Sequence, residues 1–310
     1  MADNGDMTFS NTLSLDSSVL EAALVAAGVS LNGFQIRGEV GSTNTELVRH
    51  VTTLQANSFF FDSDEPEPWA APSLMASVNQ VGGRGRTGRS WETVPGTSLT
   101  FSLHVELDSP ADTQSWLPLI VGNAVATVIR DVTGLPAQVK WPNDIVINTA
   151  EQPLDGWLGL RKLGGILVER VGSRSLVIGI GINVSQDASQ LPVPSATSLE
   201  LELIRRGMSA PASVIPDSAE SLLAQLVASV LERIQNWQAY DGDVEKSGDR
   251  SLAEALSTTV GSQAKVALAG GAELVGLVTA LGNDGSLKIV DASGETHSVY
   301  VGDVSHLRLR

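Results

Sequence analysis

A stretch rich in glycine and arginine, with no helix predicted after it, most restricts the fold of this chain. Residues 81–91 read VGGRGRTGRSW, which satisfies the G-x-G-x-x-G pattern of dinucleotide-binding folds. The same letters come within one substitution of the phosphate-binding P-loop, with Arg89 in place of its lysine. Both motifs hold phosphate at the N-terminus of a following helix. Here Pro95 and Gly96 predict a turn and residues 96–107 alternate like a strand. The sequence therefore disfavours both fold types.

Composition excludes several classes of protein. The 310 residues suffice for one large and one small domain. There is no cysteine, so disulfides and thiolate sites are excluded, and the four histidines do not stand at metal-ligand spacing. A net charge of −15 argues against a general DNA binder. Without a long apolar run or a signal peptide, we expect a soluble cytoplasmic protein with no membrane partner.

The order of predicted elements indicates a large α/β domain followed by a small all-β domain. Five short alternating runs, separated by Gly-Gly, Asn-Asp-Gly and Ser-Gly turns, predict a small barrel near the C-terminus. The charged residues 241–250 suit a linker before it. We therefore divide the chain into an N-terminal arm with a short helix (1–30), a main domain (31–250) and a barrel (258–310). The predicted helices cover 16–28, 41–54, 112–134 and 217–240, and the predicted strands of the main domain cover 32–40, 73–81, 96–107, 137–148, 161–171 and 175–185.

Three arginines within six positions of an otherwise acidic chain predict an anion site. Arg84, Arg86 and Arg89 carry planar guanidinium groups, which bind carboxylates and phosphates through paired hydrogen bonds. Because neighbouring guanidinium groups repel one another, a polyanion between them is favoured. The intervening glycines allow the backbone to close around such a ligand. A glycine-rich hairpin with solvated arginines is the plainer alternative.

Four other stretches fit the same idea, although each also has a plainer interpretation. KWPND (140–144) interrupts a strand and is equally an ordinary turn. RKLGGILVE (161–169) places a lysine before two glycines, which equally describes a surface lysine. GIGINV (179–184) ends a strand in asparagine, and GSTNTEL (41–47) is equally a helix N-cap.

Taken together and in this order, these stretches resemble the biotin protein ligase family, closely over residues 40–185 and more loosely to the C-terminus. The resemblance implies a mixed sheet flanked by helices, of the class II synthetase type, with a C-terminal SH3-like β-barrel. It implies adenylation of biotin by MgATP to biotinyl-5′-AMP. Biotin then passes to one lysine of a biotin carboxyl carrier domain in a carboxylase, with release of AMP. ATP, Mg²⁺ and biotin are thus implied as substrates, with no permanently bound cofactor.

The resemblance also implies a role for each matching residue. Lys162 would bridge the biotin carboxylate and the α-phosphate, and Arg86 would close over the adenylate. The biotin contacts implied are Ser42, Thr43, Asn44, Gln80, Arg84, Gly164 and Gly165. The ATP contacts implied are Arg86, Arg89, Trp91 on the adenine side, Lys140, Asn143, Asp144, Lys162, Asn183 and, on a looser alignment, Arg308, with Asp303 near ATP or carrier contacts. No metal ligand is firmly implied.

The chain departs from the family pattern in two places. Residues 151–160 lengthen the connection between KWPND and Lys162. About 30 residues precede the first core strand, too few for a three-helix DNA reader, which favours a ligase without repressor function. A lipoate-type acyl-adenylate ligase is the nearest alternative, a P-loop phosphotransferase is more distant, and a DNA-binding repressor lacks the basic N-terminus it needs. Monomer and homodimer both stay open.

Overall fold

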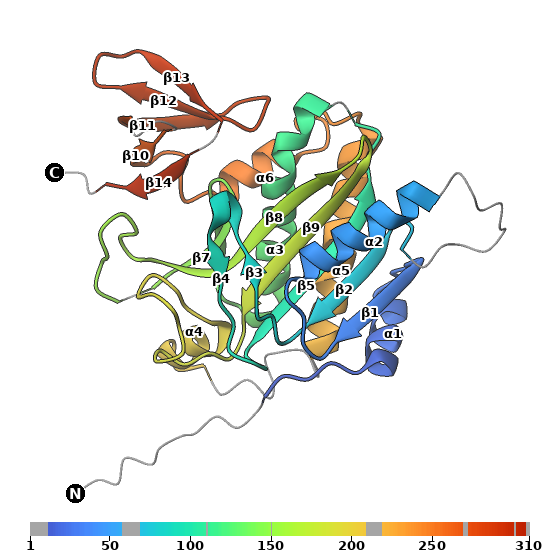
Figure 1. The fold of residues 1–310 in the computed structure, drawn as a ribbon. Helices are drawn as coiled ribbons and strands as arrows, with labels where there is room; N and C mark the ends of the chain where they lie inside the picture. Colours follow the sequence, from blue (N-terminus) through green and yellow to red (C-terminus); the bar gives the residue numbers. More distant parts are fainter. Residues whose placement is uncertain are drawn as a thin grey trace, which may run out of the picture.

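A mixed seven-stranded sheet forms the centre of the computed structural model, and Figure 1 shows its helices on both faces. The structure describes residues 12–57, 69–109, 111–149, 151–208, 219–268, 272–300 and 302–307. Only β1 and β2 pair in parallel, and every other pair in this sheet is antiparallel. In spatial order the strands are β1 (Gly33–Arg37), β2 (Ser73–Ser77), β5 (Ser98–Glu106), β9 (Ser175–Asn183), β8 (Leu160–Val171), β7 (Asp144–Asn148) and β6 (Ala137–Lys140).

The two faces of the sheet are covered differently. Helix α2 (Thr43–Asn57) lies on one face, where Leu47 and Val51 pack against β8 and β9 in a small apolar cluster. Helices α1 (Ser17–Ala26), α3 (Leu117–Thr133) and α5 (Ala219–Ala239) cover the other face around the main core. Helix α2 covers only part of β8 and β9 on its face of the sheet. The part of these two strands that α2 leaves uncovered lines the cavity described below.

Local signals explain several helix ends. The side chain of Asp16 caps α1 by accepting from the backbone N–H groups of Ser18 at 2.9 Å and Val19 at 3.0 Å. Helix α3 ends at Gly134, whose φ of 70° is left-handed and therefore suits glycine. Leu20 of α1 is fully buried in the main core, so the N-terminal helix packs as part of the main layer.

A five-stranded antiparallel sheet forms the C-terminal part, as the resemblance implies for an SH3-like barrel. Its order is β13 (Thr296–Val299), β12 (Leu287–Asp291), β11 (Glu273–Leu281), β10 (Gln263–Ala267) and β14 (Asp303–His306). The turn between β11 and β12 docks on the main domain, because its carbonyl groups accept from two indoles. Trp116 donates to Asn283 at 2.8 Å and Trp141 donates to Gly285 at 3.0 Å. Figure 1 shows this sheet beside β7 and the hairpin of β3 (Gly83–Arg84) and β4 (Ser90–Trp91).

The interpretation of residues 241–250 as a linker is wrong. Val244 is buried, and Asp249 is fully buried at the start of helix α6 (Asp249–Leu256), which packs against α3 and β11. The many charged residues of this stretch suggested an exposed linker, although the connection is compact. The short helix α4 (Leu199–Arg205) was also missed, although Ser198 caps it by accepting from the N–H of Leu201 at 3.2 Å.

The remaining predicted elements are present with shifted bounds, and the strand predicted over 137–148 is a hairpin of β6 and β7. The helix predicted over 112–134 is split into a 3₁₀ segment, Ala111–Trp116, followed by α3. The glycine- and arginine-rich stretch forms the hairpin β3 (Gly83–Arg84) and β4 (Ser90–Trp91) around a three-residue 3₁₀ turn, Arg86–Gly88. Strand β5 follows it, so the dinucleotide and P-loop interpretations lack their helix, as predicted. None of the helices in the described ranges is long and apolar enough to span a membrane.

Candidate functional site

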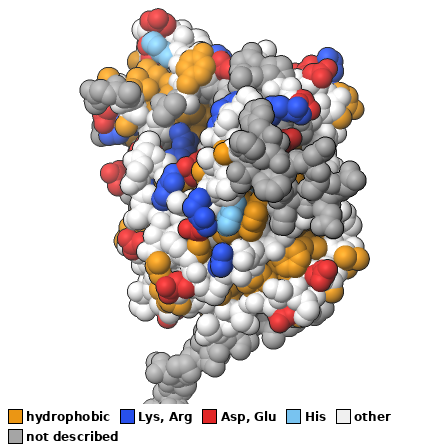
Figure 2. All heavy atoms as spheres, turned by 45° about the vertical axis from the view of Figure 1, so that its right-hand side comes forward, with side chains coloured by type: hydrophobic (Ala, Val, Ile, Leu, Met, Phe, Trp, Pro, Cys, Tyr) orange, Lys and Arg blue, Asp and Glu red, His pale blue; other side chains and the backbone are white. Residues whose placement is uncertain are grey.

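A cavity of about 600 Å³ lies between β8 and β9, the β3–β4 hairpin and strand β14. Three separate parts of the chain therefore meet at one site. Its lining includes most of the residues singled out from the sequence, namely Ser42, Thr43, Asn44, Gln80, Arg84, Arg86, Arg89, Trp91, Lys140, Asn143, Asp144, Lys162, Gly165 and Asp303. The cationic members of this lining stand on a chain of net charge −15. Figure 2 shows one face of the molecule, on which Lys and Arg side chains lie among acidic ones.

A network of buried polar side chains forms one end of the cavity. The carboxamide oxygen of Gln80 accepts from the backbone N–H of Thr43 at 2.9 Å. The Ser102 hydroxyl lies 2.8 Å from Thr43 Oγ1 and 2.6 Å from Asn44 Oδ1. Asn44 in turn donates to the Glu169 carboxylate at 2.9 Å. Because each member is held by another, this end offers fixed donors and acceptors to a small polar group.

Glycines on β8 and β9 give this site a floor without side chains. A Cβ at Gly179 would lie 2.2 Å from Asn44 Oδ1, and a Cβ at Gly181 would lie 2.7 Å from the Trp91 indole. Alanine at either position would therefore collide with a residue of the cavity. The absent side chains allow Asn44 and Trp91 to rest directly on the sheet.

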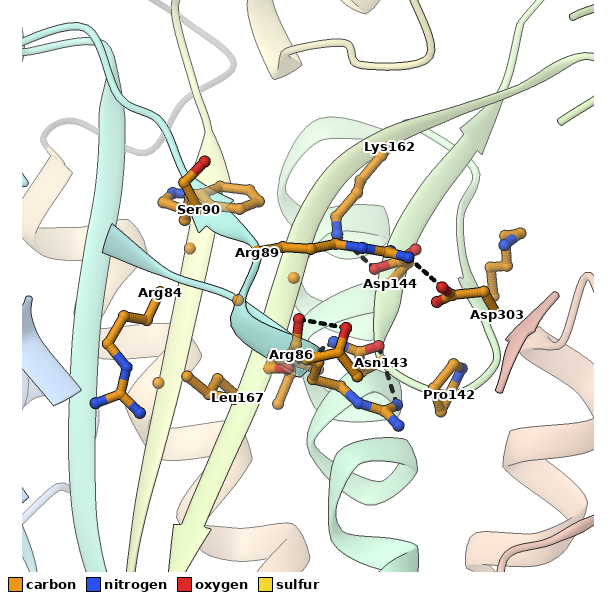
Figure 3. A pocket seen from close by; sticks show the side chains of 18 of the residues that line it. Arg84, Arg86, Arg89, Ser90, Pro142, Asn143, Asp144, Lys162, Leu167 and Asp303 are labelled. Carbon is orange, nitrogen blue, oxygen red and sulfur yellow. Dashed lines mark hydrogen bonds and ion pairs between the residues drawn. The ribbon is translucent and has the colours of Figure 1, made fainter. Parts of the chain in front are cut away.

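An ammonium and a carboxylate face each other at the centre of the cavity. Lys162 Nζ lies 2.6 Å from Asp144 Oδ1, and their side chains are 29% and 15% exposed. Lys162 also lies 5.6 Å from the ring centroid of Trp91. Arg86 reaches the same region and donates to Asn143 Oδ1 at 3.4 Å (Figure 3). Burial lowers the pKa of Arg86, although a guanidinium stays protonated near neutral pH.

The other two arginines of the hairpin are held at the two sides of the cavity. Arg84 pairs with Glu169 of β8 and donates to the Thr45 hydroxyl at 3.1 Å. Arg89 pairs with Asp303 of β14, the contact marked in Figure 3. Both pairs are substantially exposed, so each contributes little net stability. The two guanidinium groups can therefore exchange these partners for a ligand anion at small cost.

Lys140 is the most buried cation of the site, at 5% exposure. Its ammonium donates to the Val304 carbonyl of β14 at 2.6 Å and lies 4.6 Å from the ring centroid of Trp157. Burial lowers the pKa of Lys140, while the nearby Asp144 carboxylate favours its charged form.

Two expected site residues lie apart from this cluster, and a third is not described by the structure. Asn183 is buried outside the lining, where it donates to the Thr197 carbonyl at 2.9 Å and accepts from Gln186 at 3.1 Å. The Cα of Gly164 turns toward the neighbouring strand, since a Cβ there would meet the Gly181 carbonyl at 2.7 Å. Arg308 lies outside the described residues.

Three contributors to the site were not predicted from the sequence. Glu169 closes the KLGGILVE stretch and could have been noticed as the acid within that candidate motif. Ser102 lies inside a strand with no local signal. Trp157 belongs to the 151–160 insertion, and only the fold brings it to Lys140.

Comparisons with known proteins agree with this geometry. The profile of the biotin/lipoate A/B protein ligase family matches residues 48–187. A biotin–[acetyl-CoA-carboxylase] ligase of Mycobacterium tuberculosis is 30% identical over 298 residues, which cover 95% of this chain and 96% of that protein. The chain belongs to the biotin protein ligase family.

More distant members of the family match in part. The bifunctional ligase/repressor BirA of Escherichia coli is 36% identical over 159 residues, which cover 50% of this chain and 45% of that longer protein. A solved biotin protein ligase from Aquifex aeolicus, in complex with biotin and ATP, superposes with a TM-score of 0.63 at 21% identity, covering 89% of this chain and 99% of that one. The latter shows that the two share a fold, which confirms the predicted fold class. The predicted family is confirmed by the Mycobacterium tuberculosis relative.

Proposed function

We propose that this protein adenylates biotin with MgATP and then transfers biotin to a lysine of a carrier protein, releasing AMP. The observation that carries this proposal is the meeting of Arg86, Lys140 and Lys162 in one cavity beside the buried polar network of Thr43 and Gln80. Such a site suits a ligand with an anionic part and a small neutral polar part. Biotin and ATP together supply both, since biotin carries a ureido ring at one end and a carboxylate at the other.

In the first step, a biotin carboxylate oxygen bonds to the α-phosphorus of ATP while the bond to pyrophosphate breaks. Both reactants are anions, so the barrier is largely electrostatic and the site must supply positive charge. Lys162 is suited to this role because its ammonium already holds a carboxylate, that of Asp144, at 2.6 Å. Arg86 and Arg89 add charge from the hairpin. Asn143 and Asp144 offer oxygen atoms of the type that Mg²⁺ prefers.

In the second step, the acceptor lysine amine attacks the acyl carbon of the adenylate, and AMP leaves. The adenylate hydrolyses if water reaches it first. The β3–β4 hairpin covers the cavity with Arg84, Arg86 and Arg89, so we assign it the exclusion of water. Ser42, Asn44 and Gly165 would complete the biotin side.

The finer assignments are part of the same proposal. The acceptor would be the biotin carboxyl carrier domain of a biotin-dependent carboxylase, and the reaction would take place in the cytoplasm. Trp91 stays a predicted contact of the adenine side, and Asn183 a predicted contact of the adenine or ribose. The division at residues 30, 250 and 258 stays a prediction, in which the C-terminal unit supplies Asp303 to the cavity wall.

The test is ATP–pyrophosphate exchange by the purified protein with biotin, with lipoate or with no acid added. We expect exchange to depend on biotin. Exchange that depended on lipoate would keep the chemistry but replace the substrate with that of the lipoate ligases. A folded protein with Mg²⁺ that exchanged with neither acid would contradict the proposal.

A further inference from the structure

Residues 151–160, which lengthen the connection before Lys162, form an ordered strap at the edge of the cavity. Its base is held by Arg161, a side chain with only 2% exposure. The Arg161 guanidinium donates to the carbonyl groups of Gln152 at 2.8 Å and Leu160 at 2.9 Å, and pairs with Glu151 at 3.5 Å. A buried guanidinium bound to backbone carbonyls fixes the strap in one conformation.

The tip of the strap is bonded to the C-terminal sheet. The Gly156 carbonyl accepts from the backbone N–H of His306 on β14 at 2.9 Å. Gly156 has a φ of 71°, and a Cβ there would lie 3.1 Å from Ser305 Oγ, so both its conformation and its close approach require glycine. The strap therefore joins the two sheets at the cavity.

Trp157 follows this tip and lines the cavity. Its ring centroid lies 4.6 Å from Lys140 Nζ, which also donates to the Val304 carbonyl at 2.6 Å. An ammonium has three N–H donors. One N–H of the Lys140 ammonium points at the Val304 carbonyl, and the Trp157 ring covers another side of the group. The remaining N–H is available to an anion in the cavity.

We propose that Trp157 is a positioning residue that holds the Lys140 ammonium in place for the phosphates of ATP. The inference rests on the proposed function for the identity of the anion. A free lysine has a flexible four-carbon stem, and fixing it costs conformational entropy when a ligand binds. The ring and the β14 carbonyl fix it beforehand, so the strap contributes to ATP affinity without touching biotin.

The test measures binding of MgATP and of biotin separately by calorimetry, in the wild type and in Trp157→Leu and Trp157→Phe. A cation–π contact of this kind predicts about fivefold weaker MgATP binding in Trp157→Leu. Biotin binding should change by less than about twofold, because the contact lies on the cation side of the cavity. Trp157→Phe keeps an aromatic face and should recover most of the loss. Trp69→Leu, at an indole stacked on His50 and not among the lining residues, is the matched control.

A double-mutant cycle with Lys140→Met identifies the route of the effect. If Trp157 acts through Lys140, Trp157→Leu should have almost no further effect on MgATP binding in the Lys140→Met background. Independent, additive losses would overturn the proposal, as would equal losses of MgATP and biotin affinity. A wild type that bound MgATP with this coupling but showed no biotin-dependent exchange would refute the proposed function alone. A wild type that did not bind MgATP would refute both.

Discussion

Replacing Lys162 with methionine should remove most activity while leaving the protein folded. The ammonium lies 2.6 Å from Asp144, but the two side chains keep 29% and 15% exposure, so solvent screens the pair. Its loss should therefore lower the free energy of unfolding by only about 1–2 kcal/mol. In the transition state the same ammonium meets developing charge, where loss of one well-placed donor costs about a hundredfold to a thousandfold in rate. The loss of activity should thus far exceed the loss of stability.

The assay compares biotin-dependent ATP–pyrophosphate exchange with urea unfolding in the same variants. Lys265→Met is a matched control, because that lysine pairs with Glu273 at 3.0 Å on the surface of the C-terminal sheet. It should keep both its exchange rate and its stability. A Lys162→Met variant that retained more than about a tenth of the exchange rate would refute the reasoning, given the effect expected of such a donor. So would a loss of activity that merely followed the fraction unfolded.

Three further predictions test other parts of the site. Gly181→Ala places a Cβ 2.7 Å from the Trp91 indole and should weaken MgATP binding about tenfold in calorimetry, the usual cost of overpacking; unchanged affinity would contradict this. Arg86→Gly should keep exchange but release the adenylate, so a bystander protein becomes biotinylated on a streptavidin blot; wild-type selectivity would count against it. Burial lowers the pKa of His306 to about 4, against about 6.5 when unfolded, so the unfolded chain takes up the proton first. Stability should therefore fall between pH 6.5 and 4 by up to about 3 kcal/mol, and urea midpoints should depend less on pH in His306→Asn.

Most of the large elements could be predicted from the sequence because their signals are local. The N-cap of α1 at Asp16, the stop at Gly134 and the alternation in residues 96–107 each depend on neighbours in the chain. The connection around Asp249 could not be predicted in the same way. Its carboxylate is fully buried because Ser247 donates to it at 2.7 Å and Arg233 pairs with it at 3.3 Å, and charge alone suggests exposure.

The same distinction between local signals and long-range contacts applies to the site. Its motif residues could be recognised from the order of short stretches, but their contacts could not. Lys140 meets Val304 across 164 positions of sequence, a separation that no local pattern encodes. The contact of Trp157 with Lys140 could not be predicted either, because the strap that carries Trp157 is positioned by its hydrogen bond to β14.

The cavity lies where the main sheet meets the C-terminal sheet, and its lining takes Asp303 and Val304 from the C-terminal sheet and Lys140 and Lys162 from the main sheet. A ligand that fills this space necessarily touches both parts, so its binding energy adds to the contacts that join them. Without ligand, the two sheets are already joined by the strap, the β11–β12 turn, the packing of α6 on β11 and a shared apolar core. Bound substrate should therefore add to an existing connection, so that saturating ligand raises the urea midpoint of both parts together.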